Sequence, residues 1–236
     1  MLRTQLSVLP ETIDVRTEFP QWVSQHCDSN SVVLDVGAGR GEAANQSVIQ
    51  QKVARLVGID PDAGIALNPY LDEKYQSSIE EFARNRGAEF DRLYTMFVLE
   101  HVARPSDFLF ACKSLLKPGG MLFGVTPNLW HYFGMTTKLS SSIGVEDWLL
   151  DRLIGSQVKA SYHFSTTYRL NSIPTIGRAL EQTGFREVEF KCFDQTNRFE
   201  GYFPRSLRWF PGVYSRLAYT LNLPHVMGFI MFRATA

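Results

Sequence analysis

Four apolar runs lie between residues 32 and 126, and polar or helix-forming stretches separate them. The runs begin at Val32, Leu56, Phe90 and Met121, and each has the length of a buried strand. The stretch from Gly41 to Val53 reads as a helix that crosses from the first run to the second. This alternation predicts an α/β protein with a parallel sheet, whose right-handed crossovers bring the carboxyl ends of the strands to one edge.

The flanking segments extend this pattern into a single domain over residues 1–236. In residues 1–30, Phe19, Trp22 and Val23 are spaced as on one face of a helix, which predicts an N-terminal helical segment. In the last third, Glu187–Phe193 alternates as a strand, and Val226–Arg233 reads as the terminal strand.

A glycine-rich loop follows the first apolar run. The sequence VVLDVGAGRGEAA places Asp35 at the end of the strand and Gly37, Gly39 and Gly41 directly after it. Glycine at every second position lets the chain turn sharply and lets a ligand lie against the backbone. The second run ends in Asp60, whose carboxylate can accept both hydroxyls of a ribose. The spacing therefore predicts an adenosine-type ligand.

The loop disfavours phosphate. A dinucleotide fingerprint would have glycine where Glu42 stands, and no Lys followed by Ser or Thr closes the loop as in a P-loop. A ligand without phosphate but with positive charge suits Asp35 and Glu42. S-adenosylmethionine, which carries an ammonium and a sulfonium, meets this requirement.

Four motifs in register resemble the class I S-adenosylmethionine-dependent methyltransferases of the small-molecule type. They are LDVGAGRGE, VGIDPD, FDRLYTMFVLEHV and LLKPGGMLFGVTPN, and the likeness extends over about residues 31–190. The resemblance implies a Rossmann-like, doubly wound, mostly parallel seven-stranded sheet with an antiparallel terminal strand. It also implies a set of cofactor-binding residues, namely Asp35, Gly37, Gly39, Gly41, Asp60, Pro61, Ser78, Ile79 and Met96. Where the family often has an acidic residue followed by an apolar one, this chain has Ser78 and Ile79, so Ser78 is at least as well explained as a helix cap.

Residues 128–162 form an insertion after the apolar run that begins at Met121. The insertion is rich in aromatic residues, and we expect it to be a lid over the substrate. Methyl transfer from a sulfonium needs alignment rather than a metal, but a hydroxyl nucleophile must still lose its proton. Histidine suits this task near neutral pH. His163 and His101 are the candidate bases, and His131, Tyr168 and Arg169 are candidate substrate-binding residues.

The acceptor is open between several possibilities. YHFSTTYRLNS, residues 162–172, resembles a stretch of methyltransferases that act in bacterial glycan assembly, which favours a sugar hydroxyl of a glycan or its lipid-linked precursor. The LEHV motif and the aromatic lid favour a quinone or phenolic metabolite instead. A protein that binds S-adenosylmethionine without catalysis is the third possibility, and the intact loop with Asp60 argues against it.

Residues 197–224 mix aromatic rings with Arg205, Arg208 and Arg216. This composition suits a segment at a membrane surface, and it suits equally a helical hairpin packed on the protein or on a second subunit.

Charge and cysteine content limit the partners, the metal sites and the cellular location that we expect. Lys plus Arg number 24 and Asp plus Glu number 24, so no nucleic-acid partner is expected. Three widely spaced cysteines indicate neither a disulfide framework nor a zinc site. The chain shows no signal sequence and no apolar run long enough to span a bilayer, so we expect a cytoplasmic protein, with any membrane contact peripheral.

Overall fold

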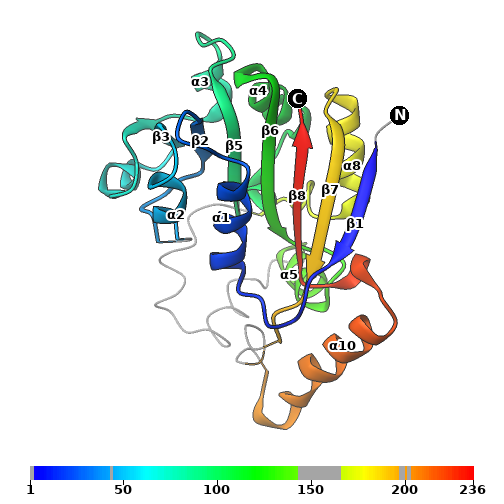
Figure 1. Ribbon diagram of the computed structural model, residues 1–236. Coiled ribbons are helices and arrows are strands. Elements are labelled where there is room, and N and C mark those ends of the chain that lie inside the picture. The colour runs from blue at the N-terminus through cyan, green and yellow to red at the C-terminus, as the bar shows by residue number, and fades with distance from the viewer. Residues whose placement is uncertain (1–2, 43–44, 143–165, 197–199, 201–202) are drawn as a thin grey trace.

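The computed structural model describes residues 3–42, 45–142, 166–196, 200 and 203–236. Their strands form one eight-stranded sheet in the order β1-β7-β8-β6-β5-β2-β3-β4 (Figure 1). In chain order the strands are β1 (Thr4–Val8), β2 (Val32–Val36), β3 (Arg55–Asp60), β4 (Glu73–Gln76), β5 (Phe90–Met96), β6 (Leu116–Pro127), β7 (Arg186–Phe193) and β8 (Phe229–Thr235).

The sheet is parallel except at β8, which pairs antiparallel with β6 and with β7. The predicted doubly wound class and its antiparallel terminal strand are thus confirmed, but the predicted number of seven strands is wrong. The additional strand is β1, which pairs parallel with β7 from Thr4 to Val8. Most of its side chains are exposed, so it has no clear apolar face by which the sequence could reveal it.

Helices cover both faces of the sheet (Figure 1). One layer holds α1 (Val15–Gln25) and α2 (Ser47–Gln50), whose buried side chains join a core with Val33, Tyr94 and Phe123. The other layer holds α3 (Ile79–Ala83), α4 (Pro105–Leu115) and α8 (Ile173–Gln182), packed against Leu34, Leu93 and others. Short 3-10 helices connect these elements: η1 (Ala63–Leu67), η2 (Leu99–His101), η4 (Arg205–Leu207) and η5 (Pro224–Val226).

Two helices, α1 and α2, were predicted from the sequence, and the structure tests both predictions. The N-terminal helix is confirmed as α1, where Asp14 accepts a hydrogen bond from the Arg16 N–H and starts the helix. The crossing helix predicted from Gly41 to Val53 is wrong in extent, because α2 covers only Ser47–Gln50. Gly41 has a φ of +85°, outside the right-handed helical region, so no helix can begin there.

The second half of the chain adds structure beyond the carboxyl ends of the parallel strands. α5 (Tyr132–Ser142) lies in the first part of the predicted lid, and residues 143–162 of that lid lie outside the described residues. α10 (Trp209–Thr220) lies beyond the ends of β6 and β7 and projects from the body of the sheet (Figure 1). The last strand starts at Phe229 rather than at Val226, because Pro224–Val226 forms η5. Within the described part of the chain, no helix is both long and apolar enough to cross a membrane.

Candidate active site

The glycine loop, Gly37–Gly41, closes the carboxyl end of β2. The N–H groups of Gly37 and Ala38 both donate to the Ile59 carbonyl, at 2.9 and 3.1 Å, which ties the loop to β3. Gly37 has a φ of +77°, and a Cβ there would lie 2.2 Å from Cγ2 of Val98. Gly39 has a φ of +49°, and a Cβ there would meet no protein atom within 4 Å. Gly37 therefore allows close packing, whereas Gly39 faces open space.

Asp60 stands at the end of β3 and holds the loop from the other side. Its Oδ2 accepts the Gly39 N–H at 2.9 Å, and its Oδ1 accepts the Asp62 N–H at 2.8 Å. Each carboxylate oxygen keeps a further lone pair for another donor. Pro61 follows on the surface, and its carbonyl accepts a hydrogen bond from Gln76 at 3.2 Å.

Beneath the loop runs a chain of buried hydrogen bonds that sequence reasoning missed except for Asp35. Asp35 Oδ2 accepts from the Tyr94 hydroxyl at 2.7 Å and from Gln46 Nε2 at 2.5 Å. Asn68 Nδ2 then donates to Gln46 Oε1 and to the Ala38 carbonyl, both at 3.0 Å. Burial raises the pKa of the Asp35 carboxyl to about 7. These partners come from three separate segments, and nothing in their local sequence pattern singles them out.

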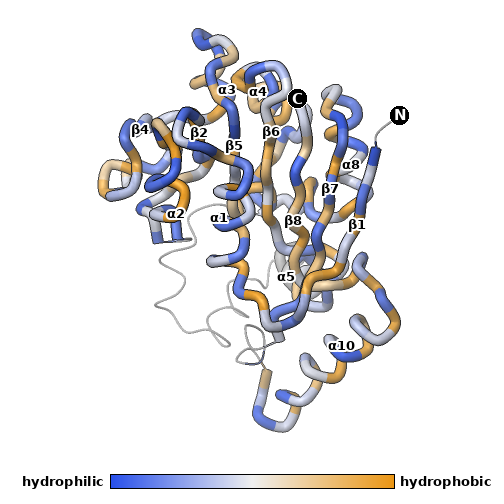
Figure 2. Tube along the Cα trace, in the orientation of Figure 1, coloured by the Kyte–Doolittle hydropathy of each residue, from blue (hydrophilic) through white to orange (hydrophobic). Residues whose placement is uncertain are grey.

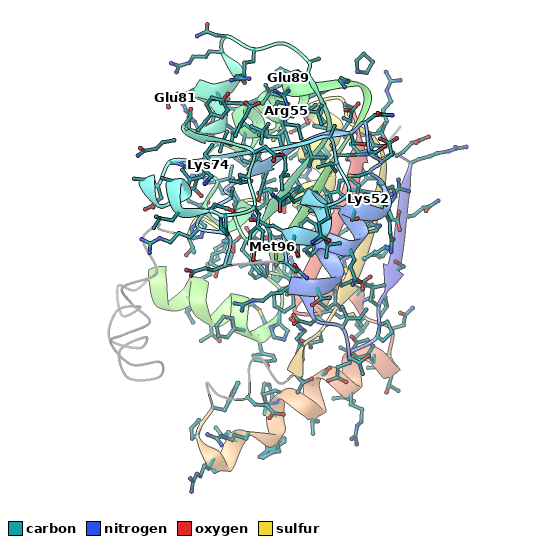
Figure 3. All side chains as sticks on the ribbon, turned by 60° about the vertical axis from the view of Figure 1, so that its left-hand side comes forward. Lys52, Arg55, Lys74, Glu81, Glu89 and Met96 are labelled. Carbon is teal, nitrogen blue, oxygen red and sulfur yellow. The ribbon has the colours of Figure 1, made fainter. Side chains whose placement is uncertain are left out.

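The remaining predicted cofactor residues lie at the ends of β4 and β5. Ser78 caps α3, its hydroxyl accepting the Glu81 N–H at 3.2 Å, and Ile79 is buried in the core. The cap interpretation of Ser78 is therefore confirmed. Met96 is the last residue of β5 and is buried. Figure 3 shows Met96 at the end of the sheet that faces α5, with Arg55 and Glu89 at the opposite end.

The LEHV motif contacts the stretch that resembles glycan methyltransferases. The Glu100 carbonyl accepts the N–H groups of Thr167 and Tyr168, at 2.6 and 3.1 Å. The buried Glu100 carboxylate accepts the Thr126 hydroxyl at 3.2 Å, and Asn171 donates in turn to that hydroxyl at 2.5 Å. Burial raises the pKa of the Glu100 carboxyl to about 7.

Three predicted site residues of the LEHV motif and of residues 162–172 differ in their exposure to solvent. His101 is half-buried in η2, and Tyr168 is half-buried with a φ of +52°. Arg169 is exposed, and its guanidinium donates to the Ala103 carbonyl at 2.9 Å. His163 lies outside the described residues.

A second buried polar group, which we name the His131 cluster, comprises His131, Tyr132, Asp194 and Tyr214. His131 Nε2 faces Asp194 Oδ2 at 3.6 Å, and both side chains are almost completely buried. The ring of His131 lies 3.9 Å from that of Tyr132 and 5.2 Å from that of Tyr214. Asp194 follows β7 and is another residue that sequence reasoning missed, because a single carboxylate after a strand has no motif around it.

The contacts within the His131 cluster define a tautomer. His131 Nδ1 accepts the Phe133 N–H at 3.4 Å, which leaves the ring hydrogen on Nε2, toward Asp194. Asp194 Oδ1 accepts the Gln195 N–H at 2.9 Å, which fixes the carboxylate. A carboxylate thus faces Nε2, and the lone pair of Nδ1 accepts the Phe133 N–H.

The structure brings most of the candidate residues to the carboxyl edge of the parallel strands. The glycine loop, Asp60, Met96, Glu100 and His131 follow or end neighbouring strands there. In open α/β sheets this edge is where ligands bind. The described residues contain no group of three or more metal-ligating side chains.

Comparisons with known proteins place the chain in a family. A family model described as a methyltransferase domain matches residues 11–189. The ubiquinone biosynthesis O-methyltransferase of Azoarcus sp. is 37% identical over 116 residues, which cover 45% of this chain and 49% of that protein. The human mitochondrial ubiquinone biosynthesis O-methyltransferase is 31% identical over 181 residues, which cover 72% of this chain and 45% of the relative. The chain spans about half the length of these relatives.

Solved structures agree with the family in fold. A S-adenosylmethionine-dependent methyltransferase from Archaeoglobus fulgidus has a TM-score of 0.58 and 17% identity, covering 93% of this chain and 96% of that one. Another, from Mesorhizobium loti, has a TM-score of 0.59 and 15% identity, covering 93% and 97%. Because the family model matches well over half of its residues, the chain belongs to the methyltransferase domain family, and its fold is that of class I S-adenosylmethionine-dependent methyltransferases.

Proposed function

We propose that the protein transfers a methyl group from S-adenosylmethionine to a hydroxyl of a small phenolic acceptor. The observation that carries this proposal is the placement of the buried His131–Asp194 pair at the same sheet edge as the glycine loop and Asp60. The relatives named as ubiquinone biosynthesis O-methyltransferases support the quinone alternative of the sequence analysis. The glycan acceptor, which the sequence favoured first, has no support among the comparisons.

The residues of the glycine loop fit the cofactor. Open space over Gly39 leaves room for a ligand against the backbone, and the spare lone pairs of Asp60 can accept the two ribose hydroxyls. Gly37, Gly41, Pro61, Ile79 and Met96 would complete the binding site. When bound, the cofactor supplies the activated methyl group. Asp35 would set the shape of the loop from below, and its ionisation near pH 7 would add negative charge near the cationic end of the ligand.

The His131–Asp194 pair would receive the proton. When bound, the cofactor would supply the methyl group, with its C–S bond breaking as the O–C bond forms. The acceptor hydroxyl would replace the Phe133 N–H as the partner of His131 Nδ1 and would give its proton to that nitrogen. Asp194 then stabilises the imidazolium. A phenol, with a pKa of about 10 in tyrosine, gives its proton to histidine much more readily than the less acidic hydroxyl of a sugar. This difference favours a phenolic acceptor.

Aromatic rings around His131 support the same acceptor class. Tyr132 packs edge-on against Phe210 at 5.2 Å, Tyr214 at 4.8 Å and Phe203 at 5.8 Å. Flat apolar walls of this kind bind aromatic ligands by stacking. Tyr168 and Arg169 remain predicted substrate residues, and His101 and His163 remain alternative bases.

A transfer assay with labelled methyl groups tests the proposal. The purified protein is incubated with S-adenosylmethionine and, in parallel, with ortho-dihydroxybenzoates, other phenols, simple sugars and a lipid-linked glycan extract. We expect label in the phenolic products and the demethylated cofactor in equal amounts. Label only in the glycan fraction would restore the sugar acceptor. Cofactor binding without transfer to any acceptor would favour the non-catalytic alternative.

A further inference from the structure

Helix α10 exposes large apolar side chains along one line. Trp209, Val213, Leu217 and Leu221 follow one another at intervals of four residues, the spacing of one helix face. Trp209 is 60% exposed, Leu217 is 54% exposed, and Leu221, which caps the helix, is 61% exposed. We name these four residues the α10 stripe.

The α10 stripe is not the face by which the helix docks on the protein. Pro211, Ser215 and Ala218 are buried on the opposite side of the helix. The Tyr214 hydroxyl donates to the Val226 carbonyl at 2.7 Å, and the Tyr219 hydroxyl donates to the Leu9 carbonyl at 3.1 Å. The helix is thus anchored to the body of the protein while its apolar stripe faces solvent.

The charges beside the α10 stripe are all positive. Arg205 and Arg208 precede the helix and Arg216 lies within it, and all three side chains are exposed. Residues 201–224 contain no Asp or Glu. An apolar line edged by arginines matches an anionic lipid surface, where rings enter the headgroup boundary and guanidinium groups pair with phosphate. Self-association through the same face would bring these like charges together, which disfavours a second copy as the occupant.

The position of α10 also suits a bilayer contact. The helix projects from the body of the molecule at the end of the sheet that carries the candidate site (Figure 1). Figure 2 shows hydrophobic and hydrophilic residues interspersed along α10. Nothing in the described structure packs over the outer side of Trp209 or Leu221 enough to bury it.

We propose that the α10 stripe and its three arginines form a docking surface for an anionic membrane. The rings and aliphatic side chains enter the headgroup boundary while the arginines contact lipid phosphates. The helix thereby holds the candidate site close to the bilayer. The docking surface stands independently of the acceptor, because vesicle binding requires neither substrate nor turnover.

Co-sedimentation with vesicles tests the docking surface. The full chain is mixed with phosphatidylcholine vesicles with and without phosphatidylglycerol, at low and at high salt. We expect binding only to the anionic vesicles, and weaker binding at high salt. Replacing Arg205, Arg208 and Arg216 by Gln should lower the partition coefficient about fivefold for each arginine. Leu217→Glu should remove most of the binding, since it places a charge within the stripe.

Matched variants separate lipid binding from damage to the fold. Phe110→Glu changes an exposed aromatic residue on α4 and should bind vesicles as the unmodified chain does. Trp209→Leu keeps the stripe apolar and should retain binding while the vesicle-induced blue shift of tryptophan emission decreases. No binding to anionic vesicles, or binding that survives Leu217→Glu, would overturn the proposal. A dimer that Leu217→Glu dissociates, without vesicle binding, would assign the stripe to contact between copies.

Discussion

The glycine loop and the His131 cluster lie at the same edge of the sheet but are assembled in different ways. The loop is held by partners from residues 35–94, and most of them are backbone groups or short polar side chains close to the motif. The His131 cluster joins residues that follow β6 and β7 with α10 of the C-terminal region. Cofactor binding therefore depends on a compact unit of the first half of the chain, whereas acceptor chemistry depends on how the second half folds back.

The largest effect should come from the His131 cluster. If His131 is the base, His131→Gln should lower turnover about a hundred- to ten-thousandfold, because a base contributes that much to proton transfer. Cofactor affinity should change little, since His131 follows β6 whereas the glycine loop follows β2, and β5 lies between these strands. Single-turnover rates and calorimetry on the same preparations measure the two quantities.

Comparison variants sharpen this prediction. His101→Gln and His163→Gln test the two histidines that the sequence favoured, and neither should match the loss in His131→Gln. Asp194→Asn should also lower turnover and should shift the pH profile of the rate. Full turnover in His131→Gln would assign the cluster to packing and return the role of base to His101 or His163.

The second largest effect should be a loss of cofactor affinity at the glycine loop. Asp60→Ala removes the acceptor of the Gly39 and Asp62 N–H groups and of the proposed ribose hydroxyls. We expect S-adenosylmethionine affinity to fall by roughly 2 to 4 kcal/mol, or about 30- to 1000-fold. Asp107→Ala, an exposed carboxylate on α4, is the control. Calorimetric affinity equal to that of the unmodified chain would show that Asp60 holds only the backbone.

How far the sequence predicts each region follows from the same difference. Asp35, Asp60 and the glycines could be identified because the loop and its strands are contiguous and glycine has a specific backbone role there. Asn68 and Gln46 could not, because an isolated buried amide resembles any surface amide in sequence. Asp194 could not be paired with His131 from the sequence, because the pairing depends on β7 and β6 lying on either side of β8 and ending at the same edge of the sheet. β1 was missed because an edge strand with exposed side chains has no apolar period.

Two buried carboxyls at this sheet edge have a pKa raised to about 7, Asp35 beneath the glycine loop and Glu100 in the LEHV motif. The folded state holds the Glu100 proton more tightly than the unfolded chain does. The stabilisation that this proton gives is complete below about pH 4.5 and is lost as the pH rises toward 7. Glu100→Gln should therefore gain stability relative to the unmodified chain across that interval, by up to about 3 kcal/mol.

Urea unfolding at pH 4.5, 5.5, 6.5 and 7.5 measures this difference, with Asp35→Asn examined in parallel. We expect the stability difference between variant and unmodified chain to grow with pH for both carboxyls. A difference for Glu100→Gln that is constant over the interval would mean that Glu100 ionises as in the unfolded chain. Equal slopes for both variants would show that burial shifts the pKa of Asp35 and of Glu100 alike.

The smallest effect should come from the support beneath the glycine loop. Asn68→Ala leaves the Ala38 carbonyl and Gln46 Oε1 without their shared donor in a buried setting. The loop should loosen, and S-adenosylmethionine affinity should fall about tenfold, or ~1.4 kcal/mol, with turnover at saturating cofactor nearly unchanged. Asn30→Ala, an exposed asparagine, is the matched control. If calorimetry shows unchanged affinity in Asn68→Ala, the loop is held by Asp60 and the Ile59 carbonyl alone; if turnover falls as well, the two regions are coupled through the loop and the separation between them is incomplete.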